Sequence, residues 1–123
     1  MFVAPLIDKY FNQVCIHEDL SEVSEWLKEL SYLVVVNDDL KVEGIITLKD
    51  VHLHPYGEII DCDIQKPVLH SSDTVPEALD LMVRSNADFL PVFDNDRFIG
   101  VISWKTLAGR LVTLLNMEQA GQL

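Results

Sequence analysis

Thr47 and Asp50 stand three positions apart in the stretch VEGIITLKDV, residues 42–51, and both side chains could bind a ligand. The apolar run at 42–46 predicts a buried strand in which Gly44 lets another backbone come close, and Thr47 stands where a helix should begin. A hydroxyl at a helix N-terminus lies beside unpaired N–H groups, where an anion can bind. One turn on, the Asp50 carboxylate can accept two hydrogen bonds from a diol. The stretch is therefore a candidate site for an anionic ligand with neighbouring hydroxyls.

The same four residues, Thr47-Leu-Lys-Asp50, also fit a capping box, in which two side chains satisfy backbone N–H groups at a helix start. Thr47 would be the N-cap, and Asp50 would take the role usually held by Glu. This interpretation needs no ligand. On these residues alone, both interpretations stay open.

His52 and His54 extend the stretch to Asp-x-His-x-His. On a strand the three side chains would share a face and form a candidate metal site for a metal-dependent enzyme. On a helix they would diverge. Because Asp50 and His52 are expected in the helix after Thr47, we expect solvated histidines and no metal site.

His70 stands beside Ser71 and Ser72, which superficially offers a base and a nucleophile. No GxSxG elbow or oxyanion loop accompanies them. We therefore expect no catalytic residue, no enzyme activity and no required cofactor.

The composition predicts a globular protein. The 123 residues are 49% hydrophobic, with a net charge of −11, and no apolar run approaches the roughly 20 residues that span a bilayer. The acidity disfavours nucleic acid and anionic membranes as partners. Cys15 and Cys62 form no disulfide framework, and no signal peptide is recognisable, so we expect a cytoplasmic chain with reduced cysteines.

The apolar periodicity predicts short, alternating strands and helices. Asp19 with Glu22 predicts a helix start, and apolar residues recur at helical spacing as far as about Ser31. The other elements predicted before residue 70 are an amphipathic lead-in helix at 4–12, strands at 14–16, 33–36, 42–46 and 67–69, a turn at 37–39 and a connector at 51–58.

The chain then repeats itself at offsets of 55 to 57 residues. Three segments match: DLSE at Asp19 with TVPE at Thr74, LVVVN at Leu33 with LPVFD at Leu90, and GIITLKD at Gly44 with GVISWKT at Gly100. Two copies of strand-helix-strand-strand-helix account for nearly the whole chain.

This repeat resembles a tandem pair of CBS domains, the cystathionine β-synthase type, which together form a Bateman module. The resemblance rests on DTVPEALDLM and FLPVFDNDRFIGVIS in the second copy and on LVVVNDDLKVEGIITLKDV in the first. It implies an α+β fold of two β-α-β-β-α repeats, packed about a pseudo-twofold axis through their small sheets. The first repeat is expected at residues 1–57 with the lead-in helix, and the second at 58–123 with the last helix and tail.

The resemblance also implies two clefts between the repeats that bind adenosine-containing ligands through a Gly-hydrophobic-x-Thr/Ser-x-x-Asp motif. Gly44, Thr47 and Asp50 match it fully, with the hydroxyl expected near phosphate and the carboxylate on the ribose hydroxyls. The opposite repeat is expected to supply the remaining wall from Val68, Leu69, His70, Leu90 and Pro91.

The second cleft is expected to be weaker. Gly100 and Ser103 match the motif, but Thr106 stands where the Asp should be. A threonine cannot accept the two charge-assisted hydrogen bonds that a carboxylate accepts from a diol. We therefore expect binding mainly at the cleft of Asp50.

The last predicted helix carries an apolar stripe, Leu107, Leu111 and Leu114, followed by Leu115. An apolar face at the end of a small chain usually packs on a partner, so we expect a homodimer through these terminal helices. The tail, Asn116 to Leu123, is expected to have no fold of its own, and a further C-terminal domain could follow it.

The sequence thus predicts a non-enzymatic regulatory module that binds AMP, ADP, ATP or S-adenosylmethionine between its repeats and modulates an attached or partner domain. The alternative is a ligand-free homodimerisation module, which the missing carboxylate at Thr106 and the acidity favour. A metal-dependent enzyme built on Asp50, His52 and His54 is the third hypothesis.

Overall fold

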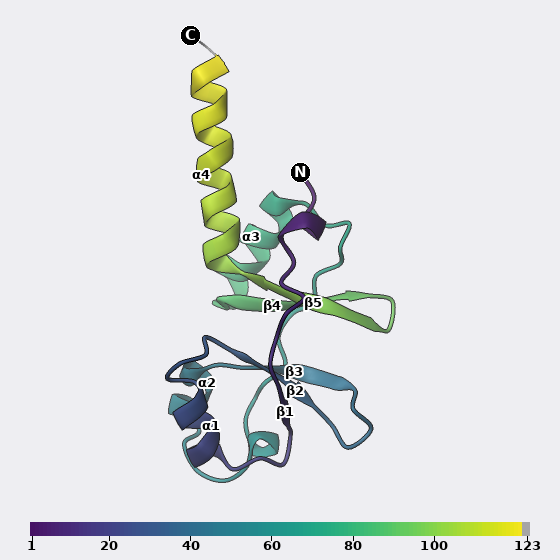
Figure 1. The fold of residues 1–123 in the computed structure, drawn as a ribbon, viewed down its shortest axis with the longest axis vertical. Helices are drawn as coiled ribbons and strands as arrows, with labels where there is room; N and C mark the ends of the chain where they lie inside the picture. The colour runs from purple at the N-terminus through teal and green to yellow at the C-terminus, as the bar shows by residue number, and fades with distance from the viewer. Residues whose placement is uncertain (122–123) are drawn as a thin grey trace. The chain divides into compact units, whose positions relative to one another are not determined.

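The computed structural model describes the backbone of residues 1–121 and the side chains of residues 1–118; Gln122 and Leu123, the end of the predicted tail, lie outside the described residues. The chain divides into two units (Figure 1). The first-repeat unit is Tyr10–Lys66, and the second-repeat unit combines Met1–Lys9 with Pro67–Leu123. Both are α+β, as predicted.

The first-repeat unit has a three-stranded sheet in the order β1-β2-β3. β1 is parallel to β2, and β2 and β3 form the predicted antiparallel hairpin. The elements are β1 Gln13–Cys15, α1 Leu20–Trp26, β2 Leu33–Val36, β3 Val42–Ile46, α2 Leu48–Leu53 and a 3-10 turn, η2 Ile59–Asp61. Asp19 caps α1 as predicted, accepting the Ser21 N–H at 2.7 Å, but the helix ends at Trp26, earlier than predicted.

The second-repeat unit repeats this order around the hairpin of β4 and β5. Its elements are η1 Ala4–Leu6, α3 Val75–Ser85, β4 Phe89–Asp94, β5 Arg97–Ser103 and α4 Trp104–Gly121. Leu69 forms a parallel bridge to Val92 beside β4, in the position that β1 takes in the first repeat. Thr74 caps α3, and Asn86 ends it in the left-handed conformation.

Each unit has its own apolar core. The first is built from Val14, Leu20, Val23, Leu27, Leu33, Val35, Ile46, Val51, Ile59 and Ile64. The second is built from Val3, Leu69, Val75, Ala78, Met82, Leu90, Val92, Ile102 and Leu107. Val3, from the very start of the chain, is therefore a core residue of the second repeat.

The N-terminal segment differs from its prediction. Residues 4–12 do not form an amphipathic helix; only Ala4–Leu6 make a 3-10 turn. The backbone instead bonds to the second repeat, because the Val3 N–H donates to Asp73 O and the Asp8 N–H donates to Val101 O. The units therefore divide differently from the predicted 1–57 and 58–123, since residues 1–9 complete the second repeat and residues 58–66 complete the first.

The two motif glycines explain this division. A Cβ on Gly44 would lie 2.3 Å from the Ile64 carbonyl oxygen, and one on Gly100 would lie 2.4 Å from the Asp8 carbonyl oxygen. The neighbouring amides of Ile45 and Val101 donate to those same carbonyls. Each hairpin is thus crossed by a backbone segment that only a glycine admits so closely.

The end of the chain also departs from its prediction. α4 is helical from Trp104 to Gly121, so residues 116–121 are helix and not an unfolded tail. It extends well beyond α3 (Figure 1). No helix in the described part of the chain is both long enough and apolar enough to cross a membrane.

We predict opposite effects of two glycine substitutions on the free energy of unfolding. Gly100→Ala should lower it by about 1 to 3 kcal/mol, because the Asp8 backbone must shift to admit a methyl group. Gly109→Ala, in the exposed middle of α4 with no atom within 4 Å of the new Cβ, should raise it by about 0.5 to 1 kcal/mol. Urea denaturation measures both. An undiminished stability in Gly100→Ala would contradict the crossing of β5 by residues 7 and 8.

Candidate ligand site at Thr47, Asp50 and Lys66

Thr47 and Asp50 meet at the junction between β3 and α2. The Thr47 N–H donates to Asp50 Oδ2 at 2.9 Å, and the Thr47 hydroxyl donates to the same oxygen at 3.0 Å. The predicted capping box is confirmed. The carboxylate that is expected to bind a diol therefore already accepts hydrogen bonds at the start of its own helix.

Asp50 accepts a third hydrogen bond, from a second residue that the sequence did not reveal. Lys66 Nζ donates to Asp50 Oδ1 at 3.0 Å. Only 15% of the Lys66 side chain and 11% of the Asp50 side chain are exposed. Of the ion pairs found among the described residues, this one is the most buried; Lys28 with Glu25 and Arg84 with Asp80 are both more than half exposed.

Cys62 lies within the electrostatic reach of this pair. Burial raises the pKa of its thiol, the negative charges of Asp50 and Asp61 raise it further, and Lys66 opposes the rise. The thiol is consequently held in its neutral form. It donates weakly to the His54 carbonyl oxygen at 3.6 Å.

The second repeat builds the same junction without charge. The Ser103 hydroxyl donates to the Thr106 hydroxyl at 2.8 Å, and the Thr106 N–H donates to Ser103 Oγ at 3.1 Å. Ser103 and Thr106 thus occupy the places of Thr47 and Asp50, as the repeat predicts. Thr106 is exposed and offers a single neutral hydroxyl.

The residues predicted as the opposite wall all lie in the second-repeat unit. The Leu69 N–H donates to Pro91 O, and the Leu69 carbonyl accepts from the Phe93 N–H, so Leu69 and Pro91 are brought together. Leu69 and Leu90 are core residues with 1% and 0% exposure, and their side chains fill their own unit. Val68 is 45% exposed and His70 is also exposed, so these two side chains are accessible.

Asp94 anchors the segment that carries His70. It accepts the Ser71 N–H at 3.0 Å and the Ser71 hydroxyl at 2.6 Å. These two bonds lower the pKa of the Asp94 carboxyl below its ordinary value. His70 Nδ1 lies 2.9 Å from the Phe93 carbonyl oxygen. The hydrogen bonds of Ser71 and His70 therefore stabilise the local fold.

The histidines after Asp50 lie in and just after a helix. Asp50 and His52 belong to α2, and His54 is its C-cap, so the three residues do not share a strand face. Throughout the part of the chain that the structure describes, no three His, Cys, Asp or Glu side chains are grouped so that they could hold a metal ion.

The CBS domain family matches residues 10–54 and 58–113, which is most of the chain and both repeats. The chain belongs to the CBS domain family. The two matches follow the internal repeat; the first ends just after α2, and the second ends within α4.

Solved structures of CBS domain pairs share the fold. CBSX2 in complex with AMP is 17% identical, with a TM-score of 0.76, and the match covers 92% of this chain and 97% of that chain. The CBS domain pair of protein MJ0100, in complex with 5′-methylthioadenosine and S-adenosyl-L-methionine, is 19% identical, with a TM-score of 0.76 and coverage of 92% and 96%.

Two curated relatives are longer than this chain. An uncharacterized 17.7 kDa protein of Acidianus ambivalens is 30% identical over 108 residues, which are 80% of this chain and 66% of that protein. A homoserine O-acetyltransferase of Methanosarcina acetivorans is 26% identical over 117 residues, which are 88% of this chain but only 21% of that protein. The CBS repeats match a minor part of the enzyme.

Within the CBS motif of the first repeat, sequence reasoning found Gly44, Thr47 and Asp50 but missed Lys66. The lysine lies 16 residues beyond Asp50 and outside the motif. Gly44 is the signal in the sequence that could have indicated it. A glycine in this strand predicts that another segment crosses it closely, and the residues after that crossing must lie near the start of α2.

We predict that Lys66→Met lowers the free energy of unfolding by about 2 to 4 kcal/mol, since it leaves the Asp50 charge largely buried without its cation. Lys28→Met is the matched control, because it removes an exposed ion pair and should cost about 0 to 1 kcal/mol. Urea denaturation compares the two variants. Equal effects would mean that the Asp50 and Lys66 pair is solvated.

Proposed function

We propose that this CBS domain pair is a regulatory module that binds one adenosine-containing ligand through the first-repeat motif. The observation that supports it most is the largely buried Asp50 carboxylate in the first turn of α2, held in place by Thr47 and Lys66. The complexes of CBSX2 with AMP and of MJ0100 with 5′-methylthioadenosine and S-adenosyl-L-methionine support the ligand class.

Asp50 would accept hydrogen bonds from the ribose hydroxyls, which are charge-assisted and therefore strong. As part of this proposal, residues of the second repeat supply the remaining wall of the ligand site. Val68 and His70 have exposed side chains, and Pro91 lies beside this segment on β4, where its carbonyl accepts the Leu69 N–H. Leu69 and Leu90 would support this wall from within their core.

The second repeat should bind poorly. Its junction has hydroxyls at Ser103 and Thr106, and they bond to one another. A neutral hydroxyl gives a ribose diol one weaker hydrogen bond in place of a charge-assisted pair. The proposed stoichiometry is one ligand per chain.

The biological output would be a shift in the populations of two relative arrangements of the repeats. A ligand changes such an equilibrium only by its different affinity for the two states, commonly about 1 to 3 kcal/mol. The match to 21% of an acetyltransferase supports a role beside a separate catalytic domain. We assign no reaction to the CBS repeats themselves.

We predict that AMP binds once per chain and that Asp50→Ala abolishes binding. Asp39→Ala is the control, because it removes an exposed carboxylate from the β2–β3 turn of the same unit. Titration calorimetry gives the stoichiometry and affinity. Thermal unfolding reports binding independently, since AMP at 100 times its Kd should add about 2.7 kcal/mol of stability.

Two equal sites per chain would refute the asymmetry between the repeats. Unchanged affinity in Asp50→Ala would leave Asp50 with its capping role alone. If AMP, 5′-methylthioadenosine, S-adenosylmethionine and ATP all fail to bind or stabilise the wild-type chain, the ligand function itself is refuted.

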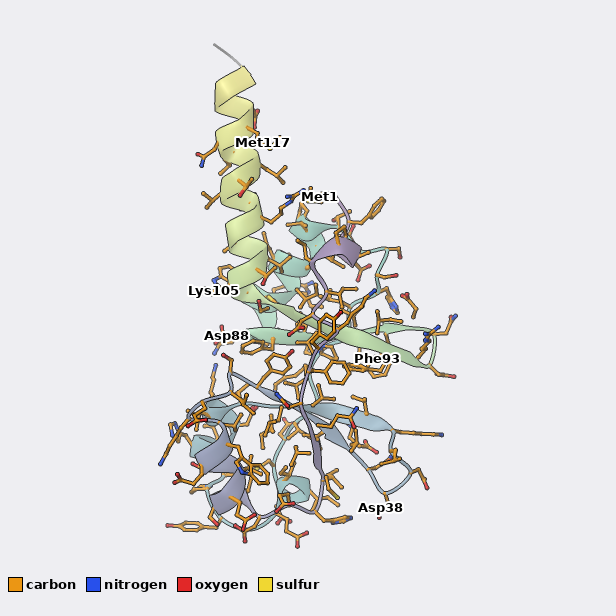
Figure 2. All side chains as sticks on the ribbon, viewed as in Figure 1. Met1, Asp38, Asp88, Phe93, Lys105 and Met117 are labelled. Carbon is orange, nitrogen blue, oxygen red and sulfur yellow. The ribbon has the colours of Figure 1, made fainter. Side chains whose placement is uncertain are left out.

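Homodimerisation is a second candidate function, favoured by the surface of α4. Leu107 is fully buried in its own core, so it is not part of an exposed stripe as predicted. The exposed apolar face is instead Trp104, Leu111 and Leu115, at helical spacing, with 41%, 40% and 50% exposure. Figure 2 shows Met117 on the outer part of α4, well beyond Lys105 at its start.

We predict that Leu115→Glu weakens a dimer that Asn116→Glu leaves intact, because only the first substitution puts charge on this apolar face. Light scattering at micromolar concentration gives the mass of each variant and of the wild type. A wild-type monomer that stays monomeric with AMP would remove this candidate function.

A further inference from the structure

Lys66 already bonds to the Asp50 carboxylate, which is the group that the proposed function assigns to the ribose hydroxyls. Asp50 Oδ2 accepts two hydrogen bonds from Thr47, and Oδ1 accepts one from Lys66. A carboxylate has about four acceptor positions in all. Only about one remains, so a diol cannot place both of its hydroxyls on Asp50 while all three bonds persist.

Lys66 is the partner that can leave. The Thr47 bonds join residues three apart at a helix start and are held by the local backbone. Lys66 reaches Asp50 from a residue 16 positions away, through a flexible four-carbon side chain. Releasing the lysine therefore disturbs less of the fold than opening the capping box.

A released Lys66 needs a new acceptor. Its side chain is only 15% exposed, and an ammonium group that loses its counter-charge away from bulk water is costly. A ligand that brings an anionic group offsets this cost, whereas an uncharged nucleoside does not. The six-residue helix α2 is too short to supply an anion site by itself.

The second repeat shows the same positions without either charge. Asp8 crosses β5 at Gly100 as Ile64 crosses β3 at Gly44, so Tyr10 corresponds to Lys66, just as Thr106 corresponds to Asp50. The positions that correspond to the cation and the carboxylate are thus both uncharged at the second motif, although Tyr10 itself is the first residue of the first-repeat unit. This pattern is expected if the two side chains act together as an ion pair.

We propose that Lys66 is a specificity residue that exchanges partners, bonding to Asp50 in the empty site and to an anionic group of the ligand in the filled one. The module consequently selects phosphorylated adenosine over adenosine. This inference rests on the proposed function and adds the charge of the ligand to it.

The test compares AMP with adenosine by titration calorimetry on wild type, Lys66→Met, Lys66→Arg and the control Lys28→Met. Wild type and Lys28→Met should bind AMP about tenfold or more tighter than adenosine. In Lys66→Met, AMP should weaken about tenfold or more while adenosine holds or tightens, because the diol no longer competes for Oδ1. Lys66→Arg keeps the charge and should keep the preference for AMP.

Circular dichroism of each variant establishes that it is folded. If Lys66→Met is not, Lys66→Gln takes its place with the same expected loss of AMP affinity, because it also removes the charge but can still donate a hydrogen bond to Asp50. Equal affinities of wild type for AMP and adenosine, or an equal loss of both ligands in Lys66→Met, would overturn the role of Lys66 and leave the proposed function standing. If wild type binds neither ligand nor any other adenosine compound, the proposed function fails and the inference fails with it.

Discussion

The close approach of a backbone segment to a glycine in each hairpin is the constraint on which the rest of this structure depends. At Gly44 the crossing segment is residue 64, and at Gly100 it is residue 8. In both places the next amide along the strand donates to the crossing carbonyl. A side chain on either glycine would push the segment away, so the hydrogen bond and the crossing depend on each other.

This constraint also sets the polar chemistry at the first motif. Because Ile64 is held against β3, Lys66 two residues later comes within 3.0 Å of Asp50 at the start of α2. A carboxylate that would otherwise only cap a short helix becomes the centre of a partly buried network. Such a network stabilises the unit, and under the proposed function the same bonds would have to rearrange for a diol to bind.

The two repeats share a backbone fold, but they differ in the charge at their motifs and in the segments that pack on them. The first repeat has a charged pair at its motif, whereas the second has hydroxyls at its motif and a start that the N-terminal segment completes. The second also carries α4, whose exposed apolar face has no counterpart on the six-residue α2. The charged motif of the first repeat is the basis of the proposed ligand site, and the exposed apolar face of α4 is the basis of the proposed dimer contact.

The sequence by itself determined the local features of this protein. The hairpins, the caps at Asp19 and Thr74, the Thr47 capping box and the α+β repeat all follow from residue types at short spacing, because each depends on neighbours within a few positions. The internal repeat and its resemblance to CBS domains extended this to the whole chain, and the family match confirmed it. The lost carboxylate at Thr106 could also be read directly from the repeat.

Only the tertiary structure decided which segments complete which repeat. Residues 4–12 have helical periodicity, yet the backbone of residues 1–9 bonds to the second repeat. The hydrogen bonds to Asp73 and Val101 and the burial of Val3 outweigh a weak helical preference. The partner of Asp50 was hidden for a related reason. Lys66 is distant in sequence and belongs to no motif, and it reaches the carboxylate because Gly44 lets the chain cross β3 at Ile64.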